Sequence, residues 1–314
     1  MLEDGKYLSF KKEKDDFLFL SFFVYGNKYR KKKLSDGTEK LYLRDLKHFN
    51  KFLYNLESPT SLSDVGIVQL DAYEKEINKE FSSSTAHRKL KMIRSLLRFG
   101  FKVEFYERDM THYIQLPQIQ NTKQERKLNR KEVQLLLDEM KQKQLNRVIG
   151  SLLIMMGLRV SELCNATWND IYEGTSGQTM IRVFGKGEKP RRLKLKPDIF
   201  GLILQYRAAN NLSIIIGSQV DEPLIVNSKG KSLNDRVVRY MINRAAKRAG
   251  INKNVSPHWF RHSAITFALD DGAGIDEVRR MAGHSDIRTT QQYLHDLEEE
   301  KEKSASEYIS GINI

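Results

Sequence analysis

The sequence predicts a mainly α-helical protein of two domains, the second of which also contains a small β-sheet. Through most of residues 16–99, apolar side chains recur about every 3.6 positions, the spacing of amphipathic helices. A polar segment without periodicity follows at residues 117–127, and beyond it two short β-prone segments flank a glycine-rich turn. A chain of 314 residues is long enough for two domains. We therefore expect an all-α domain over residues 1–116, a linker over 117–127 and an α+β domain over 128–298.

Four helices are expected in the N-terminal domain, at residues 16–25, 38–53, 63–78 and 84–99. The first two are joined by a basic loop with one aromatic residue, consisting of Lys28, Tyr29, Arg30, Lys31, Lys32 and Lys33. Such a run is either a solvated charged surface or a contact for a polyanion, and composition alone leaves both interpretations open.

In the second domain, Asn129 and Glu132 have the spacing of a capping box, which predicts the start of a helix. A helix is expected at residues 147–156, and the turn at Gly157 places Arg159 at the start of the next one. Residues 180–184 and 191–195 are predicted strands around a hairpin turn. Further helices are expected at 233–249, 258–269, 274–281 and 287–294, followed by a charged and then apolar tail at 299–314.

The charge balance favours a polyanionic partner. Lys and Arg number 53 against 40 Asp and Glu, which gives a net charge of +13. An excess of this size suits nucleic acid or an anionic membrane surface, although basic proteins also use it for solubility. A hydrophobic content of 40% can fill ordinary cores, which excludes wholesale disorder.

The sequence predicts a cytoplasmic protein. The single cysteine, Cys164, excludes an intramolecular disulfide and fits a reducing compartment, and its apolar helical surroundings favour a packing role. No apolar run approaches the roughly 20 residues that a membrane helix needs. Residues 17–25 are the most apolar stretch near the N-terminus, but the residues after them do not form a secretory cleavage site.

The residues best suited to catalysis lie in the second domain. His258 and Arg261 are three positions apart, so on a helix they share a face. The other candidates are Arg159 in GLRVSEL, Lys186 in GKGEK, His284 in GHS, and Tyr293, nine residues after His284.

This combination suits attack by a tyrosine hydroxyl on a phosphodiester. An arginine presents a planar fork of donors that matches two phosphate oxygens and stays charged at working pH. His284 can donate a further hydrogen bond. An unperturbed tyrosine has a pKa near ~10, so His258 is the candidate that helps to remove the proton of Tyr293. The set requires no cofactor, and the sequence contains no HExxH motif or cysteine pair that would indicate a metal site.

In this order, the six residues resemble the motifs of the tyrosine recombinase, or phage integrase, family. The family pattern is an arginine in a G-L-R-x-S-E-L box, a lysine in a G-K-G hairpin, H-x-x-R, a G-H box and a tyrosine about nine residues later. The resemblance extends over residues 15–298, because residues 34–49 and 84–95 are similar to the family's first and last DNA-binding helix patterns. It implies an all-α, SAM-like core-binding domain followed by a catalytic domain.

The resemblance also implies roles for single residues. Tyr293 is the expected nucleophile, and Lys186 is expected to protonate the leaving 5′ oxygen, with Lys189 of the same hairpin as an alternative. Glu162 is expected to support Arg159 rather than to take part in the chemistry. The expected contacts with DNA are Arg30, Lys31, Lys32, Lys33, Arg88, Lys89 and Arg94.

The activity that the resemblance implies is site-specific recombination of double-stranded DNA through a 3′-phosphotyrosyl intermediate and a Holliday junction. The expected assembly is a homotetramer on two sites, formed from a monomer or dimer on each, with residues 299–314 docked into a neighbouring protomer. The short N-terminal part looks more Xer-like than phage-like, but integration, excision and dimer resolution all remain open, as do an accessory protein and a second recombinase. Two alternatives are a type IB topoisomerase and a non-catalytic DNA-binding protein on the same scaffold. We expect the protein to act on the nucleoid and not at a membrane.

Overall fold

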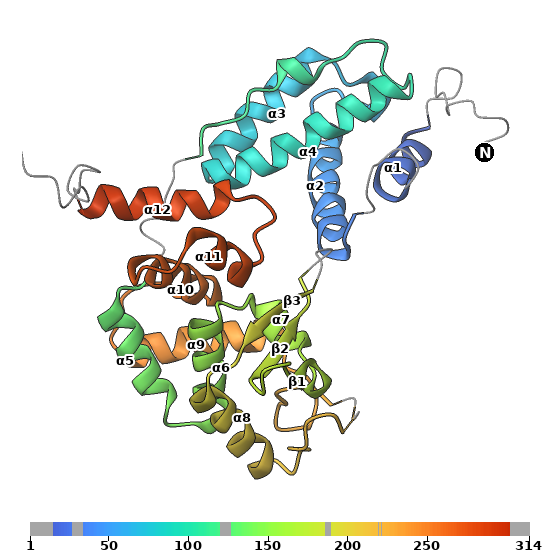
Figure 1. The fold of residues 1–314 in the computed structure, drawn as a ribbon. Coiled ribbons are helices and arrows are strands. Elements are labelled where there is room, and N and C mark those ends of the chain that lie inside the picture. The colour runs from blue at the N-terminus through green and yellow to red at the C-terminus, as the bar shows by residue number, and fades with distance from the viewer. Residues whose placement is uncertain are drawn as a thin grey trace, which may run out of the picture. The chain divides into compact units, whose positions relative to one another are not determined.

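The computed structural model describes residues 15–26, 34–119, 127–185, 190–218, 220 and 222–301 (Figure 1). The chain divides into two compact units, Met1–Asn121 and Thr122–Ile314. Helices dominate both units, and the described residues of the second unit also form a three-stranded sheet. The predicted fold class, mainly α with a small sheet, is confirmed. No helix in the described ranges is both long enough and apolar enough to span a bilayer.

The first unit consists of four helices: α1 (Asp16–Tyr25), α2 (Asp36–Tyr54), α3 (Ile67–Glu80) and α4 (Ser83–Lys102). The first, second and fourth begin within two residues of their predicted positions. The third prediction, 63–78, is wrong at its start. The carboxylate of Asp16 accepts the backbone N–H groups of Leu62 (2.7 Å) and Ser63 (3.1 Å), which belong to a short 3₁₀ turn, Leu62–Asp64, before α3.

A buried carboxylate joins α2 to α4 in the core of the first unit. Asp45 has no exposed surface, and its oxygens bind the guanidinium of Arg88 and the ammonium of Lys89, the latter at 3.5 Å. Lys89 is only 4% exposed, and its ammonium lies 4.6 Å from the ring centre of Phe81. Burial lowers the pKa of Lys89. An ion pair in this position costs desolvation energy, so it fixes the geometry of the two helices more than it adds stability.

The second unit contains eight helices within the described ranges: α5 (Arg130–Met140), α6 (Gln144–Met156), α7 (Val160–Asn165), α8 (Pro197–Ala209), α9 (Asp235–Arg248), α10 (Pro257–Asp270), α11 (Ile275–Ala282) and α12 (Arg288–Lys301). The antiparallel sheet has the order β1 (Ile171–Glu173), β2 (Thr179–Val183), β3 (Arg191–Lys194). Ile181 of β2 is paired with Ile171 on one side and Leu193 on the other. Eight of the 13 residues of helix α6 are buried, and the helix packs against α5, α8 and α10.

Several local predictions for the second unit are confirmed. The side chain of Asn129 accepts the N–H of Glu132 (2.8 Å), and the Glu132 carboxylate accepts the N–H of Asn129 (2.9 Å), which completes the capping box of α5. The two hairpin strands and α9 to α11 lie close to their predicted ranges. The sequence reading missed β1, which has three residues, and α8, although Pro197 at its first position is a typical helix start. Helix α12 extends to Lys301, beyond the predicted end at residue 294.

A small apolar cluster holds the last three helices together. Ile265 and Leu269 of α10, Val278 and Ala282 of α11, and Leu297 of α12 are all buried in it. Figure 1 shows α12 lying alongside α10 and α11 at the end of the described chain. Because the anchoring residue Leu297 lies one turn beyond Tyr293, this cluster fixes Tyr293 against its own chain.

Replacement of Gly100 tests the packing of the first unit. A Cβ at Gly100 in α4 would overlap the ring of Tyr106, which is held in place by the bond from its hydroxyl to the carbonyl of Leu62 (3.1 Å). We expect Gly100→Ala to lower the free energy of unfolding by roughly 1–3 kcal/mol, because overpacking outweighs the better helix propensity of alanine. Hydrogen-exchange mass spectrometry measures the amide protection of this unit separately from that of the second unit. Gly37→Ala is the matched control, since a Cβ in α2 meets nothing within 4 Å; equal protection in both variants would contradict the prediction.

Candidate active site

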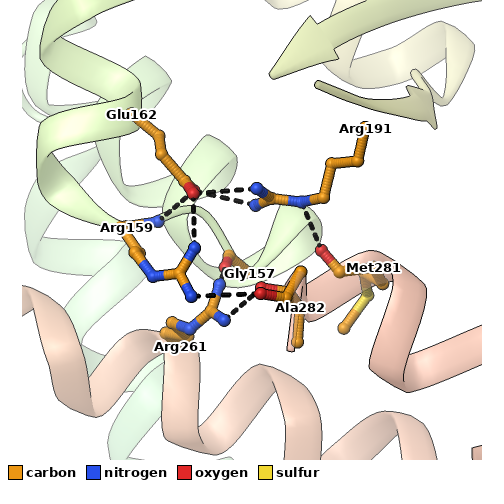
Figure 2. A network of polar contacts seen from close by, with 8 residues as sticks. Gly157, Arg159, Glu162, Arg191, Arg261, Met281 and Ala282 are labelled. Atoms are coloured by element: carbon orange, nitrogen blue, oxygen red, sulfur yellow. Dashed lines mark hydrogen bonds and ion pairs between the residues drawn. The ribbon is translucent and has the colours of Figure 1, made fainter. Parts of the chain in front are cut away.

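One buried carboxylate orients two arginines in the second unit (Figure 2). The side chain of Glu162, in the first turn of α7, is 2% exposed. Its Oε1 accepts Nη1–H groups from Arg159 and Arg191, both at 2.8 Å. Its Oε2 accepts Nη2–H of Arg191 and the backbone N–H of Arg159, also at 2.8 Å. Glu162 thus caps α7 and fixes the guanidinium groups that come from the start of α7 and the start of β3.

The carboxyl end of α11 binds a third arginine together with these two. The last carbonyl groups of a helix have no intrahelical partner and carry the negative end of the helix dipole. Three consecutive carbonyls each accept a hydrogen bond from a different guanidinium: Met281 from Nε of Arg191 (2.8 Å), Ala282 from Nη2 of Arg261, and Gly283 from Nη2 of Arg159 (3.2 Å). The end of α11 therefore draws three positive charges into one place.

Two glycines make these carbonyls available. Helices α6 and α11 both end at a glycine in the left-handed conformation, Gly157 with φ of 58° and Gly283 with φ of 64°. Glycine adopts this conformation without the steric cost of a Cβ. The carbonyl of Gly157 accepts Nη1–H of Arg261 at 2.6 Å. At Gly283 a Cβ would lie 3.0 Å from Nη1 and 3.2 Å from Cδ of Arg191, so a side chain there would also crowd the cluster.

The cluster retains a positive charge at neutral pH. Burial, and then the charge of Arg159, lowers the pKa of Arg261 to about 10, which still leaves this guanidinium protonated. Burial alone would raise the pKa of Glu162, but the hydrogen bonds and charge of Arg191, followed by the bonds from Arg159, hold it below its ordinary value. One carboxylate among three guanidinium groups leaves an excess of positive charge, which suits an anionic group.

His284 is neutral in this electropositive setting. Burial, followed by the charges of Arg261, Arg159 and Arg191, lowers its pKa to about 4. Its Nδ1 lies 2.9 Å from Oγ1 of Thr290, a fully buried residue in the first turn of α12. When the Thr290 hydroxyl donates to Nδ1, the imidazole carries its proton on Nε2 and is a hydrogen-bond donor there.

The predicted tyrosine contacts a histidine that the sequence reading did not single out. The hydroxyl oxygen of Tyr293 lies 2.5 Å from Nδ1 of His262, and the centres of the two rings are 5.2 Å apart. The ring of His258 lies 4.2 Å from that of His262 and nearly perpendicular to it. The ring of His284 lies 6.4 Å from that of Tyr293.

The structure therefore brings five of the six predicted catalytic residues into one region. Lys186, the sixth, and its alternative Lys189 lie outside the described residues. The sequence reading missed Arg191, His262 and Thr290. Their signals are positional: Arg191 opens the strand after the hairpin, His262 follows Arg261 directly, and Thr290 stands one helical turn before Tyr293.

No metal site or reactive thiol accompanies this cluster in the described part of the chain. The residues described there contain no group of three or more His, Cys, Asp or Glu side chains that could hold a metal ion. Cys164 is buried in α7, and burial, followed by the charge of Asp235, raises its pKa to about 12. Cys164 is therefore a protonated thiol at neutral pH and fits the packing role expected for it.

The basic residues of the first unit differ in what they can contact. Lys89, expected at a DNA surface, is buried against Asp45, so its position argues for a structural role and corrects that expectation. Arg88 is also paired with Asp45, but its side chain remains 36% exposed. A surface hollow between α2 and α4 is lined by Tyr42, Arg88, Lys91, Met92, Arg94, Ser95, Arg98 and Leu116. Arg30, Lys31, Lys32 and Lys33 lie outside the described residues.

The second unit carries its own basic surface on α9. A hollow on this helix is lined by Arg239, Tyr240, Asn243, Arg244 and Lys247. Tyr240 is 63% exposed. Cations interleaved with an exposed aromatic ring suit a phosphate backbone and its sugars or bases, and none of these residues was singled out from the sequence.

Replacement of Gly283 tests the importance of the carbonyls at the end of α11. We expect Gly283→Ala to lower the free energy of unfolding of the second unit by roughly 2–4 kcal/mol, since backbone strain adds to crowding of Arg191. Gly272→Ala is the matched control, because φ is 90° there and a Cβ meets nothing within 4 Å; strain alone should cost roughly 1–2 kcal/mol. Tryptophan fluorescence during urea unfolding measures both, since Trp168 and Trp259 lie in this unit. An equal loss in the two variants would show that the crowding does not matter.

The low pKa of His284 predicts a pH dependence of stability. The unfolded chain protonates this imidazole near pH 6.5, whereas the folded chain resists protonation until about pH 4. Stability should therefore be greatest above pH 6.5 and fall between pH 6.5 and 4. We expect His284→Gln to show a smaller fall in the urea midpoint over this window than the parent protein. A His295→Gln control, which removes an exposed histidine of α12, should leave the fall unchanged. A parent-like fall in His284→Gln would refute the assignment.

Comparison with known proteins identifies the family of this chain. The phage integrase family model matches residues 126–300. The tyrosine recombinase XerD of Staphylococcus saprophyticus is 31% identical over 287 residues, which cover 88% of this chain and 94% of the relative. XerD of Staphylococcus aureus is 30% identical over 269 residues, with coverage of 84% and 89%.

Two solved structures share the fold at lower identity. XerH bound to its difH substrate in a pre-cleavage complex is similar, with a TM-score of 0.66 and 18% identity. The match covers 94% of this chain and 99% of that one. A lambda integrase (75-356) dimer bound to a COC′ core site gives a TM-score of 0.69 with 14% identity, covering 95% and 99%. The family match and the identity to XerD over nearly its whole length show that this chain belongs to the phage integrase family, as a Xer-like tyrosine recombinase that cleaves and rejoins DNA.

Proposed function

We propose that this chain is a site-specific recombinase in which Tyr293 attacks a DNA phosphodiester held by the arginine cluster. The observation that carries the proposal is the gathering of Arg159, Arg191 and Arg261 at the carboxyl end of α11, close to the hydroxyl-bearing helix α12. A phosphodiester brings one negative charge and two non-bridging oxygens to a site with excess positive charge and preorganised N–H donors. Neutral His284 adds a donor without adding repulsion.

The proposed reaction exchanges one phosphate ester for another. The Tyr293 oxygen forms a bond to phosphorus while the bond from phosphorus to the 5′ oxygen breaks, which leaves a 3′-phosphotyrosyl link and a free 5′ hydroxyl. Lys186, in the hairpin between β2 and β3, is proposed to protonate the leaving oxygen, with Lys189 as the alternative. The ester retains the energy of the broken bond, so rejoining to another strand needs no cofactor.

Two basic surfaces are proposed to bind the DNA. In the first unit, residues 1–116 are proposed as the core-binding domain, with Arg88, Arg94 and the neighbouring exposed cations of α4 at the backbone. The basic loop that contains Arg30 to Lys33 would add charge to the same partner. In the catalytic domain, residues 128–298, the exposed face of α9 is proposed to contact the duplex through Arg239, Tyr240 and Arg244.

The proposed assembly is a homotetramer on two sites that exchanges strands through a Holliday junction, with residues 299–314 docked into a neighbouring protomer. A lambda integrase tetramer bound to a Holliday junction has a similar fold, with a TM-score of 0.69 at 15% identity. This likeness supports a fold compatible with such an assembly. Each site would bind a monomer or a dimer before pairing, with or without an accessory protein or a second recombinase.

Two observations favour this function over its alternatives. Similarity to XerD extends over 88% of the chain, including the N-terminal unit, which favours a recombinase over a type IB topoisomerase. The arginine cluster and Tyr293 are both present, which argues against a non-catalytic DNA-binding protein.

Covalent trapping on DNA tests the proposal. Fragmented genomic DNA carrying nicks prevents rejoining, so the protein should accumulate as a covalent adduct whose attached DNA identifies the site. Tyr293→Phe removes only the attacking hydroxyl, so we expect adducts to fall at least roughly a thousandfold while binding in a gel shift is retained.

Tyr308→Phe is the control, because it removes the hydroxyl of another tyrosine near the C-terminus. It should form adducts at the parent rate. Adducts that persist in Tyr293→Phe, or disappear in Tyr308→Phe, would contradict the assignment of the nucleophile. Relaxation of supercoiled DNA without exchange between paired sites would instead favour a topoisomerase.

A further inference from the structure

The hydroxyl of Tyr293 contacts a buried histidine. His262 is 9% exposed, and its Nδ1 is 2.5 Å from the tyrosine oxygen. This is the distance over which a proton can pass directly between two groups without an intervening water. The contact joins α10 to α12, whose relative position is fixed independently by the buried residues Ile265, Leu269 and Leu297.

His262 and His258 occupy different environments on α10. They are one turn apart, with ring centres 4.2 Å from each other and ring planes nearly perpendicular. His258 is exposed, whereas His262 is buried and faces the phenol. An exposed imidazole near the arginines is placed to reach a bound phosphate, and a buried imidazole on the phenol is placed to receive its proton. The geometry therefore places His262, and not the predicted His258, in contact with the hydroxyl whose proton has to be removed.

We infer that His262 is the general base that takes the proton of Tyr293. The inference rests on the proposed function, because it concerns the same attack on DNA. The Tyr293 oxygen forms its bond to phosphorus as its proton moves to Nδ1 of His262, while the bond to the 5′ oxygen breaks and that oxygen takes a proton from the general acid. In rejoining, the same proton returns from His262 to the departing tyrosine.

Proton transfer from Tyr293 to His262 sets two chemical requirements. An ordinary phenol, with a pKa near ~10, is a weaker acid than an imidazolium near ~6.5, so the proton must move as the new bond forms. Nδ1 must present a lone pair, which requires the proton of the neutral ring to be on Nε2. Titratable or charged groups close to His262 or to Tyr293 include His258 and Arg261 of α10 and His284 of the loop between α11 and α12.

Two of these neighbours do not titrate between pH 5 and 9. The pKa of His284 is about 4 and that of Arg261 is about 10. A change of cleavage rate with pH in this window therefore reports on His262, on His258, on the phenol of Tyr293 or on the general acid. In a substrate with sulfur at the 5′-bridging position, the leaving group departs without protonation. With this substrate the pH dependence of the cleavage rate therefore no longer depends on the general acid.

The test uses the full-length protein, a sulfur-bridged suicide substrate and single-turnover cleavage from pH 5 to 9. His262→Asn keeps a hydrogen-bond acceptor near the position of Nδ1 but cannot take a proton. We expect cleavage to fall roughly 10²–10⁴-fold at neutral pH and to rise steadily with pH toward the ionisation of the phenol itself. His258→Asn should be slower but should keep the parent pH profile. His295→Gln, which removes an exposed histidine of α12, should behave as the parent.

A tyrosine with a more acidic hydroxyl provides the decisive comparison. Incorporation of a fluorinated tyrosine at position 293 reduces the need for a base, so it should restore much of the lost rate in His262→Asn. It should not restore Arg261→Ala, whose defect lies in phosphate binding. His262→Gln serves as a second variant if His262→Asn melts at a lower temperature or binds DNA less well.

The outcomes distinguish failure of the proposed function from failure of the role inferred for His262. If the parent protein forms no adduct through Tyr293, the proposed function fails. If the parent cleaves but His262→Asn and His262→Gln show a uniform loss at every pH, without rescue by the fluorinated tyrosine, then His262 only positions α12 and the inference is overturned. A lost or shifted pH profile in His258→Asn would assign the base to His258 instead.

Discussion

Mutual repulsion of three guanidinium groups is the constraint that the second unit has to satisfy. Arg159, Arg191 and Arg261 come from three separate elements, and bringing them together is unfavourable without compensation. Glu162 supplies one full negative charge, and the carboxyl end of α11 supplies carbonyl oxygens that already carry the negative end of a helix dipole. The compensation is incomplete, and the remaining positive charge is what makes the site fit a phosphodiester.

The rest of the site follows from this arrangement. Helix α11 must end where its carbonyls can face the arginines, so the chain reverses there through Gly283 in the left-handed conformation. The next residue, His284, is therefore placed beside the same charges, and burial together with these charges keeps it neutral. Its bond to Thr290 fixes the start of α12, and one turn later the helix presents Tyr293 to His262. Gly283, His284 and Tyr293 thus enter the site in the order in which they occur along the chain.

A buried carboxylate with two cations also organises the first unit, but to a different end. Asp45 holds Arg88 and Lys89 so that α2 and α4 keep a fixed relation, and the remaining basic side chains of α4 line the surface hollow. Basic residues that are adjacent in sequence therefore separate into structural and exposed ones. A count of positive charges predicts a polyanionic partner for the whole chain, yet it does not indicate which lysine or arginine can reach that partner.

The sequence by itself determined the class of fold, most helices, the hairpin strands and a set of candidate catalytic residues, because these depend on local periodicity, capping and motif spacing. Asn129 with Glu132 is one such local signal, and the structure realises it as predicted. Only the tertiary structure decided which side chains meet. Arg191 and His262 acquire their roles from contacts with Glu162 and with Tyr293, 29 and 31 positions away along the chain. Burial likewise depends on packing of the whole unit, so the sequence could not separate buried His262 from exposed His258 on the same helix.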